Sequence, residues 1–253
     1  MEELSVSLYL LAAILAVVAF AYSSVGLGGA SAYTAIMAVA GMRSAAIPTV
    51  SLTLNLFVSS IGAFHFLRHA HGRLHLIAPF LVSSIPFSYI GGSLTLPPAV
   101  FYWVLLVTLV LVAIHIYLFS ESRFHLDLSG KGKIIVSLLI GSVLGFVAGA
   151  IGIGGGVYLV PLIIIFGMGT EKEAAACGAV FVWLNSASGL LSRLQHQQLD
   201  VIQYWPLLVA VIIGAGIGSL FGATRFSPQT MQRFLGGIIL VAIGFLIKKL
   251  LFV

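Results

Sequence analysis

The chain has 253 residues, of which 60% are hydrophobic and 8% are charged, and its formal net charge is +5. A soluble domain carries roughly 25% charged residues, so the composition excludes a soluble protein and predicts a polytopic membrane protein with little mass outside the bilayer. The basic residues are scattered over short loops, so we interpret the charge as membrane topology and contact with anionic lipids, not as nucleic-acid binding.

Ten apolar segments predict ten helices, and most are close to the ~20 residues that span a hydrocarbon core. Glu2 and Glu3 precede the first segment where a signal peptide would be basic, so we interpret it as a retained membrane helix. The second and the seventh segments are clearly shorter than the rest. In chain order the segments are 4–23, 29–41, 47–67, 74–95, 99–119, 134–151, 156–168, 173–194, 201–222 and 228–251.

A glycine-rich run comes directly before each short segment. The first run is Gly26-Leu27-Gly28-Gly29-Ala30, and the second is Gly152-Ile153-Gly154-Gly155-Gly156. Glycine this dense cannot continue a regular helix, because each glycine is about 1 kcal/mol less favourable there than alanine. Unwound backbone is tolerated in a bilayer only where protein covers it or where it lines a watery cavity. A matched pair of such breaks therefore points to the binding site of a transporter.

The two halves of the chain repeat each other. At an offset of 126, Gly26, Gly28, Gly29 and Gly41 fall on Gly152, Gly154, Gly155 and Gly167. At an offset of 127, Ser59, Gly62, His69, Pro79 and Gly91 fall on Ser186, Gly189, His196, Pro206 and Gly218. The series predicts a duplication, with repeats at 1–119 and 134–253 joined by a polar linker at 120–133.

The topology depends on whether the short segments cross the membrane. If both cross, each half has five crossings, the halves are inverted, both termini lie outside, and seven basic residues oppose four. If both are re-entrant, each half has four crossings, the halves are parallel, both termini lie inside, and the division is eight against three. We favour the inverted arrangement, because it brings the glycine breaks to the midplane from opposite sides. In it, Arg68, Arg73, Arg123, Lys131, Lys133, Lys172 and Arg225 oppose Arg43, Arg193, Lys248 and Lys249.

The acidic residues indicate the charge of the solute. No carboxylate lies inside a predicted membrane segment, whereas cation and proton pathways usually keep one there. An anion held by hydrogen-bond donors is therefore the expected solute. The acidic residues, all at termini, loops or segment edges, are Glu2, Glu3, Glu121, Asp127, Glu171, Glu173 and Asp200.

Two helices that begin after the breaks could aim unpaired N–H groups and positive dipole ends at one anion. The alternatives are that the glycines serve only close helix packing and that the asparagines only join helices. The expected backbone donors are Gly28, Gly29, Gly154, Gly155 and Gly156. The expected side-chain donors are Ser31, Ser51, Asn55, Tyr158 and Asn185, with Ser186 among weaker serine candidates.

Three basic residues, His65, Arg68 and Arg193, are expected to guide or gate the anion. The histidines near His65 have no accompanying carboxylate, so a metal site is not expected, and no cofactor is predicted. Cys177 is the only cysteine, which excludes an intrachain disulfide. No nucleophile has a neighbouring base and orienting acid, so we do not expect an enzyme.

The duplicated Gly-x-Gly-Gly break, the stretch from Gly152 to Pro161 and the Ser227-Pro228 turn resemble the TauE/SafE family over about residues 10–250. The first half departs from the pattern, since Ala30 replaces the last glycine and Ala35 stands in place of Pro161. The resemblance implies an exporter of small sulfur anions, such as sulfite, or of organosulfonates, such as sulfoacetate, across the bacterial inner membrane. The direction of transport follows only weakly from the resemblance.

The sequence thus predicts an all-α polytopic membrane protein of two inverted repeats, whose Gly-broken helices meet near the midplane. The expected partners are a small anion and membrane lipids, with no nucleic acid and with a homodimer as an option. Two other functions stay open, namely an anion channel and a membrane assembly factor without transport activity.

Overall fold

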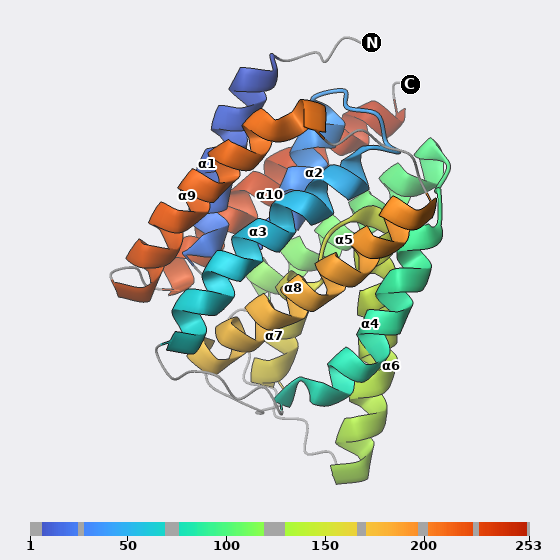
Figure 1. Cartoon of the computed structure of the whole chain (residues 1–253), viewed down its shortest axis with the longest axis vertical. Coiled ribbons are helices and arrows are strands. Elements are labelled where there is room, and N and C mark those ends of the chain that lie inside the picture. Colours follow the sequence, from blue (N-terminus) through green and yellow to red (C-terminus); the bar gives the residue numbers. More distant parts are fainter. Residues whose placement is uncertain are drawn as a thin grey trace.

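The computed structural model describes residues 7–24, 28–68, 76–118, 130–165, 171–196, 202–224 and 228–251. All regular structure in these ranges is helical (Figure 1), which confirms the all-α class. Each of the ten predicted segments coincides with one α-helix. The helices are α1 (Leu8–Ser23), α2 (Ala30–Val39), α3 (Ile47–Arg68), α4 (Ala78–Ser93), α5 (Pro98–Leu118), α6 (Gly130–Ile151), α7 (Gly156–Ile165), α8 (Glu171–His196), the short 3₁₀-helix η2 (Ile202–Tyr204), α9 (Trp205–Thr224) and α10 (Pro228–Leu251).

The outer faces of the helices are apolar. Val17 of α1 is 67% exposed, Leu139 of α6 is 65% exposed and Val241 of α10 is 61% exposed. An apolar surface of this extent is unfavourable in water and favourable against lipid. By length and composition, three described stretches can cross a membrane, namely Ile47–Phe64, Lys131–Ile151 and Ile202–Phe221. These features are those of a membrane protein.

Helices from the two halves of the chain pack against each other. Helix α1 packs along α9, α6 packs along α4, and α3 packs along α8. The beginning of α1 and the end of α10 lie at the same end of the molecule (Figure 1). Helix α1 runs away from that end and α6 runs toward it, so the first helices of the two halves have opposite directions.

The α4–α6 pair and the α1–α9 pair are closely packed through small residues. Gly145 is the middle of three glycines spaced four residues apart on α6, and a side chain there would collide with the main chain of Ser84 on α4. In the same way, a side chain on Gly214 of α9 would collide with the main chain of Ala16 on α1. Small residues let helix backbones approach closely, which is how helices associate in a membrane.

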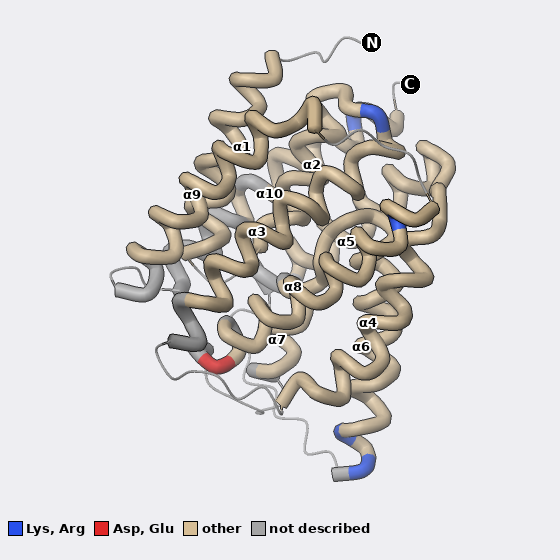
Figure 2. The backbone as a smooth tube through the Cα atoms, in the orientation of Figure 1, with Lys and Arg blue, Asp and Glu red and all other residues tan. Residues whose placement is uncertain are grey.

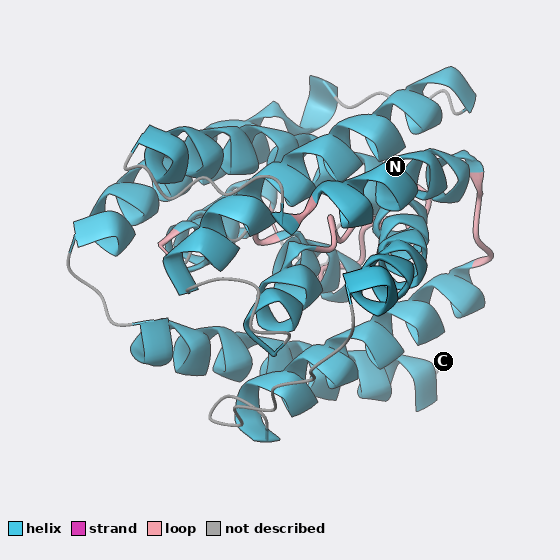
Figure 3. Ribbon diagram, turned by 90° about the horizontal axis from the view of Figure 1, so that it is seen from below, coloured by secondary structure: helices cyan, strands magenta, loops and turns pink. Residues whose placement is uncertain are grey.

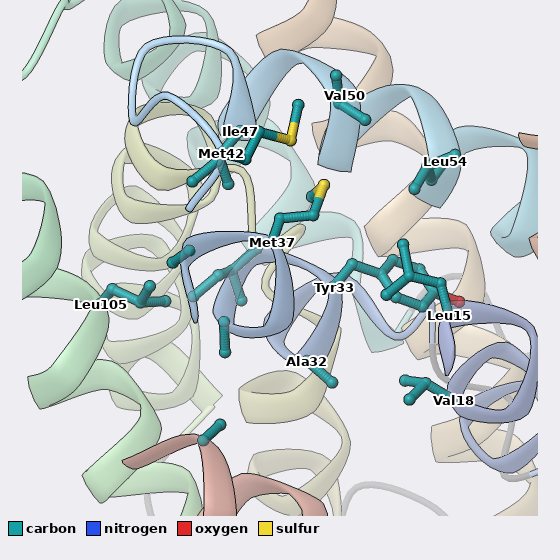
Figure 4. Close-up of a cluster of buried hydrophobic side chains, with 14 of the residues drawn as sticks. Leu15, Val18, Ala32, Tyr33, Met37, Met42, Ile47, Val50, Leu54 and Leu105 are labelled. Atoms are coloured by element: carbon teal, nitrogen blue, oxygen red, sulfur yellow. The ribbon is translucent and has the colours of Figure 1, made fainter. Parts of the chain in front are cut away.

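The short helix α2 lies inside the molecule. Tyr33 and Met37 of α2 have no exposed surface, and they pack among buried side chains that include Leu15 of α1 and Leu54 of α3. Figure 4 shows this cluster around α2, with Ile47 at the beginning of α3 beside the methionines. The break before α2 is therefore an interior feature.

Figure 2 shows charged residues near both ends of the molecule and one basic position on α8 away from the ends. Lys131 and Lys133 stand at the beginning of α6, at one end. Arg43, in the connection between α2 and α3, and Lys248, near the end of α10, stand at the opposite end.

Candidate functional site

Both glycine breaks interrupt the helical backbone inside the bundle. Gly29, the residue before α2, has a φ of 77°, and Gly152, Gly154 and Gly155 before α7 have φ values of 81°, 74° and 76°. Positive φ is the left-handed region that glycine adopts readily. Figure 3 shows loop segments in the middle of the molecule, surrounded by helices. Gly26 lies outside the described residues.

Asn55 of α3 lies between the two breaks. A side chain placed on Gly28 would collide with Asn55 Oδ1, and one placed on Gly154 would collide with Asn55 Nδ2. Asn55 has no exposed surface, and its Nδ2 donates a hydrogen bond to Ser186 Oγ of α8 at 2.9 Å. One amide thus contacts both breaks and joins the two central helices.

Ser51, one turn before Asn55 on α3, also contacts both breaks. Its Oγ donates to the carbonyl oxygen of Gly152 at 2.8 Å and lies 3.3 Å from the carbonyl oxygen of Ala30. It accepts a hydrogen bond from Thr34 Oγ1 at 2.9 Å. The structure therefore brings the first break, the second break, Ser51 and Asn55 together, as a site shared by the two breaks requires.

Val182 of α8 lies against the same two breaks as Asn55. Glycine has no Cβ, but an ideal Cβ can be placed on its backbone to show which atoms a side chain there would meet. The Cγ1 of Val182 lies 2.8 Å from such a Cβ on Gly28 and 3.3 Å from one on Gly154, and a side chain on Gly156 would also collide with Val182. The sequence reasoning did not include Val182 in the site, because a valine in an apolar helix carries no chemical signal. The one available signal was its offset of 127 from Asn55, the offset of the later series of matched residues.

The other predicted side-chain donors have protein partners. Asn185 Nδ2 donates to the Phe181 carbonyl oxygen of its own helix at 2.9 Å. Tyr158 Oη donates to the Thr108 carbonyl oxygen of α5 at 2.8 Å. Ser31 Oγ lies 3.1 Å from Tyr22 Oη, and either hydroxyl can be the donor.

The unpaired atoms of the two asparagines are acceptors. Asn55 Oδ1 and Asn185 Oδ1 are buried and have no hydrogen-bond partner within the part of the chain that the structure describes. These two oxygens would repel an anion, so an anion at this place is matched by backbone N–H groups, hydroxyls and the amide N–H groups. Gly155 contributes packing as well, since an ideal Cβ there lies 3.0 Å from the Phe181 ring.

Arg193 is buried against the C-terminus of α6. Its side chain is 2% exposed, and its Nη2 donates to the carbonyl oxygens of Gly149 at 3.0 Å and Ala150 at 2.6 Å. A basic group there satisfies helix carbonyls and interacts favourably with the helix dipole. The side chains of His65 and Arg68 lie outside the described part, so guidance by the three basic residues stays a prediction.

Two tyrosines and a threonine lie at the first break and were not among the site residues predicted from the sequence. Thr34 donates to Ser51, Tyr22 pairs with Ser31, and the Tyr33 hydroxyl lies beside Gly29. Their positions in apolar segments gave no signal beyond residue type. Only the helical spacing of Gly29 and Tyr33, four residues apart, could have indicated that contact.

The chain is similar to known proteins over nearly its whole length. Residues 10–246 match the sequence model of a family described as Sulfite exporter TauE/SafE. The Probable membrane transporter protein y4hK of Sinorhizobium fredii is 34% identical over 230 residues, which is 89% of this chain and 92% of the relative. The Probable membrane transporter protein YjnA of Bacillus subtilis is 27% identical, over 86% of this chain and 91% of the relative. No solved structure matches the chain.

Proposed function

The chain belongs to the TauE/SafE family, and we propose that it is a secondary transporter that exports small sulfur-containing anions across the bacterial inner membrane. Sulfite and organosulfonates such as sulfoacetate are the expected substrates. The family assignment and the names of the relatives, which describe membrane transporters and not enzymes, support the transport part. The substrate and the direction rest on the family description.

The observation that carries the proposal is the meeting of the two glycine breaks around Ser51 and Asn55. Neither side chain has any exposed surface, and the same is true of Ser186. A solute can reach this place only after helices move, which is how a carrier with a midplane site works and is unlike an open channel.

The electrostatics of the place where the two breaks meet favour an anion. The first N–H groups of α2 and α7 have no acceptor within their helices, and each helix presents its positive dipole end at a break. Among the described side chains, the carboxylate is that of Glu173, at the beginning of α8 and toward one end of the molecule (Figure 2). Of the described side chains that lie against the break glycines, none is a carboxylate.

The packing supports two inverted repeats, at 1–119 and 134–253, joined by the linker 120–133. The first helix of each half packs on the fourth helix of the other half, as α1 on α9 and α6 on α4. The third helices, α3 and α8, pack on each other. A duplicated unit related by a two-fold axis in the membrane plane has these pairings and the opposed directions of α1 and α6.

Export of an anion needs no coupling ion. An inside-negative potential favours anion efflux by ~2.3 kcal/mol per charge per 100 mV. With no carboxylate expected in the membrane interior, we propose voltage-driven uniport, with one repeat rocking against the other to expose the site on alternate sides.

Thermal unfolding of the purified protein tests this function. The melting temperature is measured with sulfite, sulfate, thiosulfate, sulfoacetate, taurine, phosphate and acetate, because a ligand of the folded state stabilises it by mass action. We expect a dose-dependent rise with sulfite or a sulfonate, and saturable flux of the same anion in proteoliposomes. No shift with any anion would favour the channel or the assembly factor.

A pair of variants locates the bound anion. Leucine matches asparagine in shape and lacks its polar atoms, so Asn55→Leu and Asn185→Leu remove the amide at each position. Because Asn55 contacts both breaks and Asn185 bonds its own helix, Asn55→Leu should reduce the anion-induced rise in melting temperature much more than Asn185→Leu does. A larger loss with Asn185→Leu would show that the anion binds away from the breaks.

A further inference from the structure

The two breaks differ in chemistry although they match in sequence. The first is surrounded by hydroxyl side chains, from Tyr22 of α1 and from Ser31 and Tyr33 of α2. At an offset of 126 the corresponding residues are Ala148, Val157 and Leu159. Hydroxyl donors are therefore present at these positions in the first break and absent from them in the second.

Tyr33 has a buried hydroxyl that makes no hydrogen bond within the part of the chain that the structure describes. Side chains of a helix lean toward its N-terminus, so the Tyr33 ring covers the first turn of α2. Its Oη lies 2.7 Å from an ideal Cβ on Gly29, the residue before α2. Tyr33 has no exposed surface, and its Oη has no hydrogen-bond partner among the described residues. Figure 4 shows the ring reaching from α2 toward Leu15 of α1.

Among the described residues, the hydroxyl pair of Tyr22 and Ser31 has one proton without an acceptor. The two oxygens are 3.1 Å apart and share one hydrogen bond, which uses one of their two protons. Tyr22 also lies at Gly29, since its Cβ is 3.2 Å from an ideal Cβ there. Both residues are fully buried. Hydroxyls from α1 and α2 thus stand around the same glycine.

The backbone adds donors at the same place. The N–H groups of Ala32 and Tyr33 donate to the Gly29 carbonyl oxygen at 3.1 Å and 3.0 Å. The N–H groups of Ala30 and Ser31 precede them and have no acceptor within the helix. Within the described ranges, the N-terminus of α2 therefore offers two N–H donors beside the hydroxyls of Tyr22, Ser31 and Tyr33.

We propose that the first break alone binds the oxyanion head of the substrate. The head group accepts hydrogen bonds from the Tyr33 hydroxyl, from the spare proton of the Tyr22–Ser31 pair and from the N–H groups of Ala30 and Ser31. This inference rests on the proposed function and adds to it the residues that recognise a sulfite or sulfonate group.

The test is Tyr33→Phe, which deletes one oxygen and keeps the ring. Two quantities are measured on the purified protein, the melting temperature without ligand and the dissociation constants for sulfite and methanesulfonate. Losing a hydrogen bond to an anion should weaken binding about tenfold or more. Removing an unpartnered buried hydroxyl should leave the ligand-free melting temperature equal or higher.

The opposite changes in affinity and stability separate binding from a structural role. The control is Tyr89→Phe, because Tyr89 Oη donates to Gln195 on an exposed surface, and its dissociation constants should not change. Ser31→Ala is a second test in case Tyr33→Phe fails to fold, and it should also weaken binding about tenfold.

The outcomes distinguish the two proposals. If the wild type binds sulfite or methanesulfonate and both variants bind as tightly, the subsite at the first break is wrong and the proposed function stands. A lower ligand-free melting temperature in Tyr33→Phe, with unchanged affinity, would also overturn the subsite. If the wild type binds neither probe, the proposed function fails and the subsite fails with it.

Discussion

Polar side chains inside this molecule are used mainly to hold its own backbone. Ser51 bonds the carbonyl oxygen of Gly152, Tyr158 bonds that of Thr108, and Asn185 bonds that of Phe181. A buried polar group without a partner is unfavourable, so most polar groups in a membrane interior find one in the protein. Candidate ligands are therefore the polar atoms left over, such as the Tyr33 hydroxyl.

Arg193→Lys tests whether the buried guanidinium acts through its charge or through its shape. The guanidinium donates to two carbonyl oxygens of α6, and a lysine ammonium cannot reproduce its planar fork. We expect the variant to be less stable by about 1–3 kcal/mol, because a buried carbonyl loses its donor. Thermal unfolding in detergent measures the change.

Arg43→Lys is the matched control for Arg193→Lys, since Arg43 is exposed, and its melting temperature should not change. If Arg193→Lys melts like the wild type while sulfite flux falls, Arg193 would be a guide for the anion and not a cap for α6.

The sequence predicts the helices well because glycine and hydrophobicity act locally. The short segments 29–41 and 156–168 appear as α2 and α7, and each begins at its glycine break. The packing partners could not be predicted, because uniformly apolar helices carry no stripe that selects a neighbour. The contact of Asn55 with Gly28 and Gly154 depends on that packing, and so do the contacts of Val182 with the two breaks.

A pair of glycine substitutions tests the close packing of α6 on α4. Gly145→Ala places a methyl group against the Ser84 carbonyl, whereas Gly216→Ala, in the interior of α9, meets nothing within 4 Å. We expect Gly145→Ala to destabilise the protein by about 1–3 kcal/mol through overpacking. Gly216→Ala should stabilise it by up to about 1 kcal/mol through helix propensity. The measurement is thermal unfolding, and equal effects would contradict the packing.

At the scale of the whole molecule, the opposed ends predict which residues share a side of the membrane. Single cysteines are introduced as Arg43→Cys, Lys131→Cys and Lys248→Cys after Cys177→Ala removes the native thiol. An impermeant thiol reagent should label positions 43 and 248 from one side and position 131 from the other, because they lie at opposite ends. The parallel arrangement with eight crossings would instead place 131 with 248.

The pairing of α1 with α9 also has a consequence for how the protein assembles during its synthesis. Helix α1 leaves the ribosome long before α9, its main neighbour, has been made. At about 5–20 residues per second, α1 remains without that neighbour for on the order of ten seconds or more. Its α9-facing surface must meanwhile be covered by lipid or by the insertion machinery. The bundle therefore cannot be completed before α9 has been made, and a chain cut after the first half leaves α1 and α4 without their main neighbours.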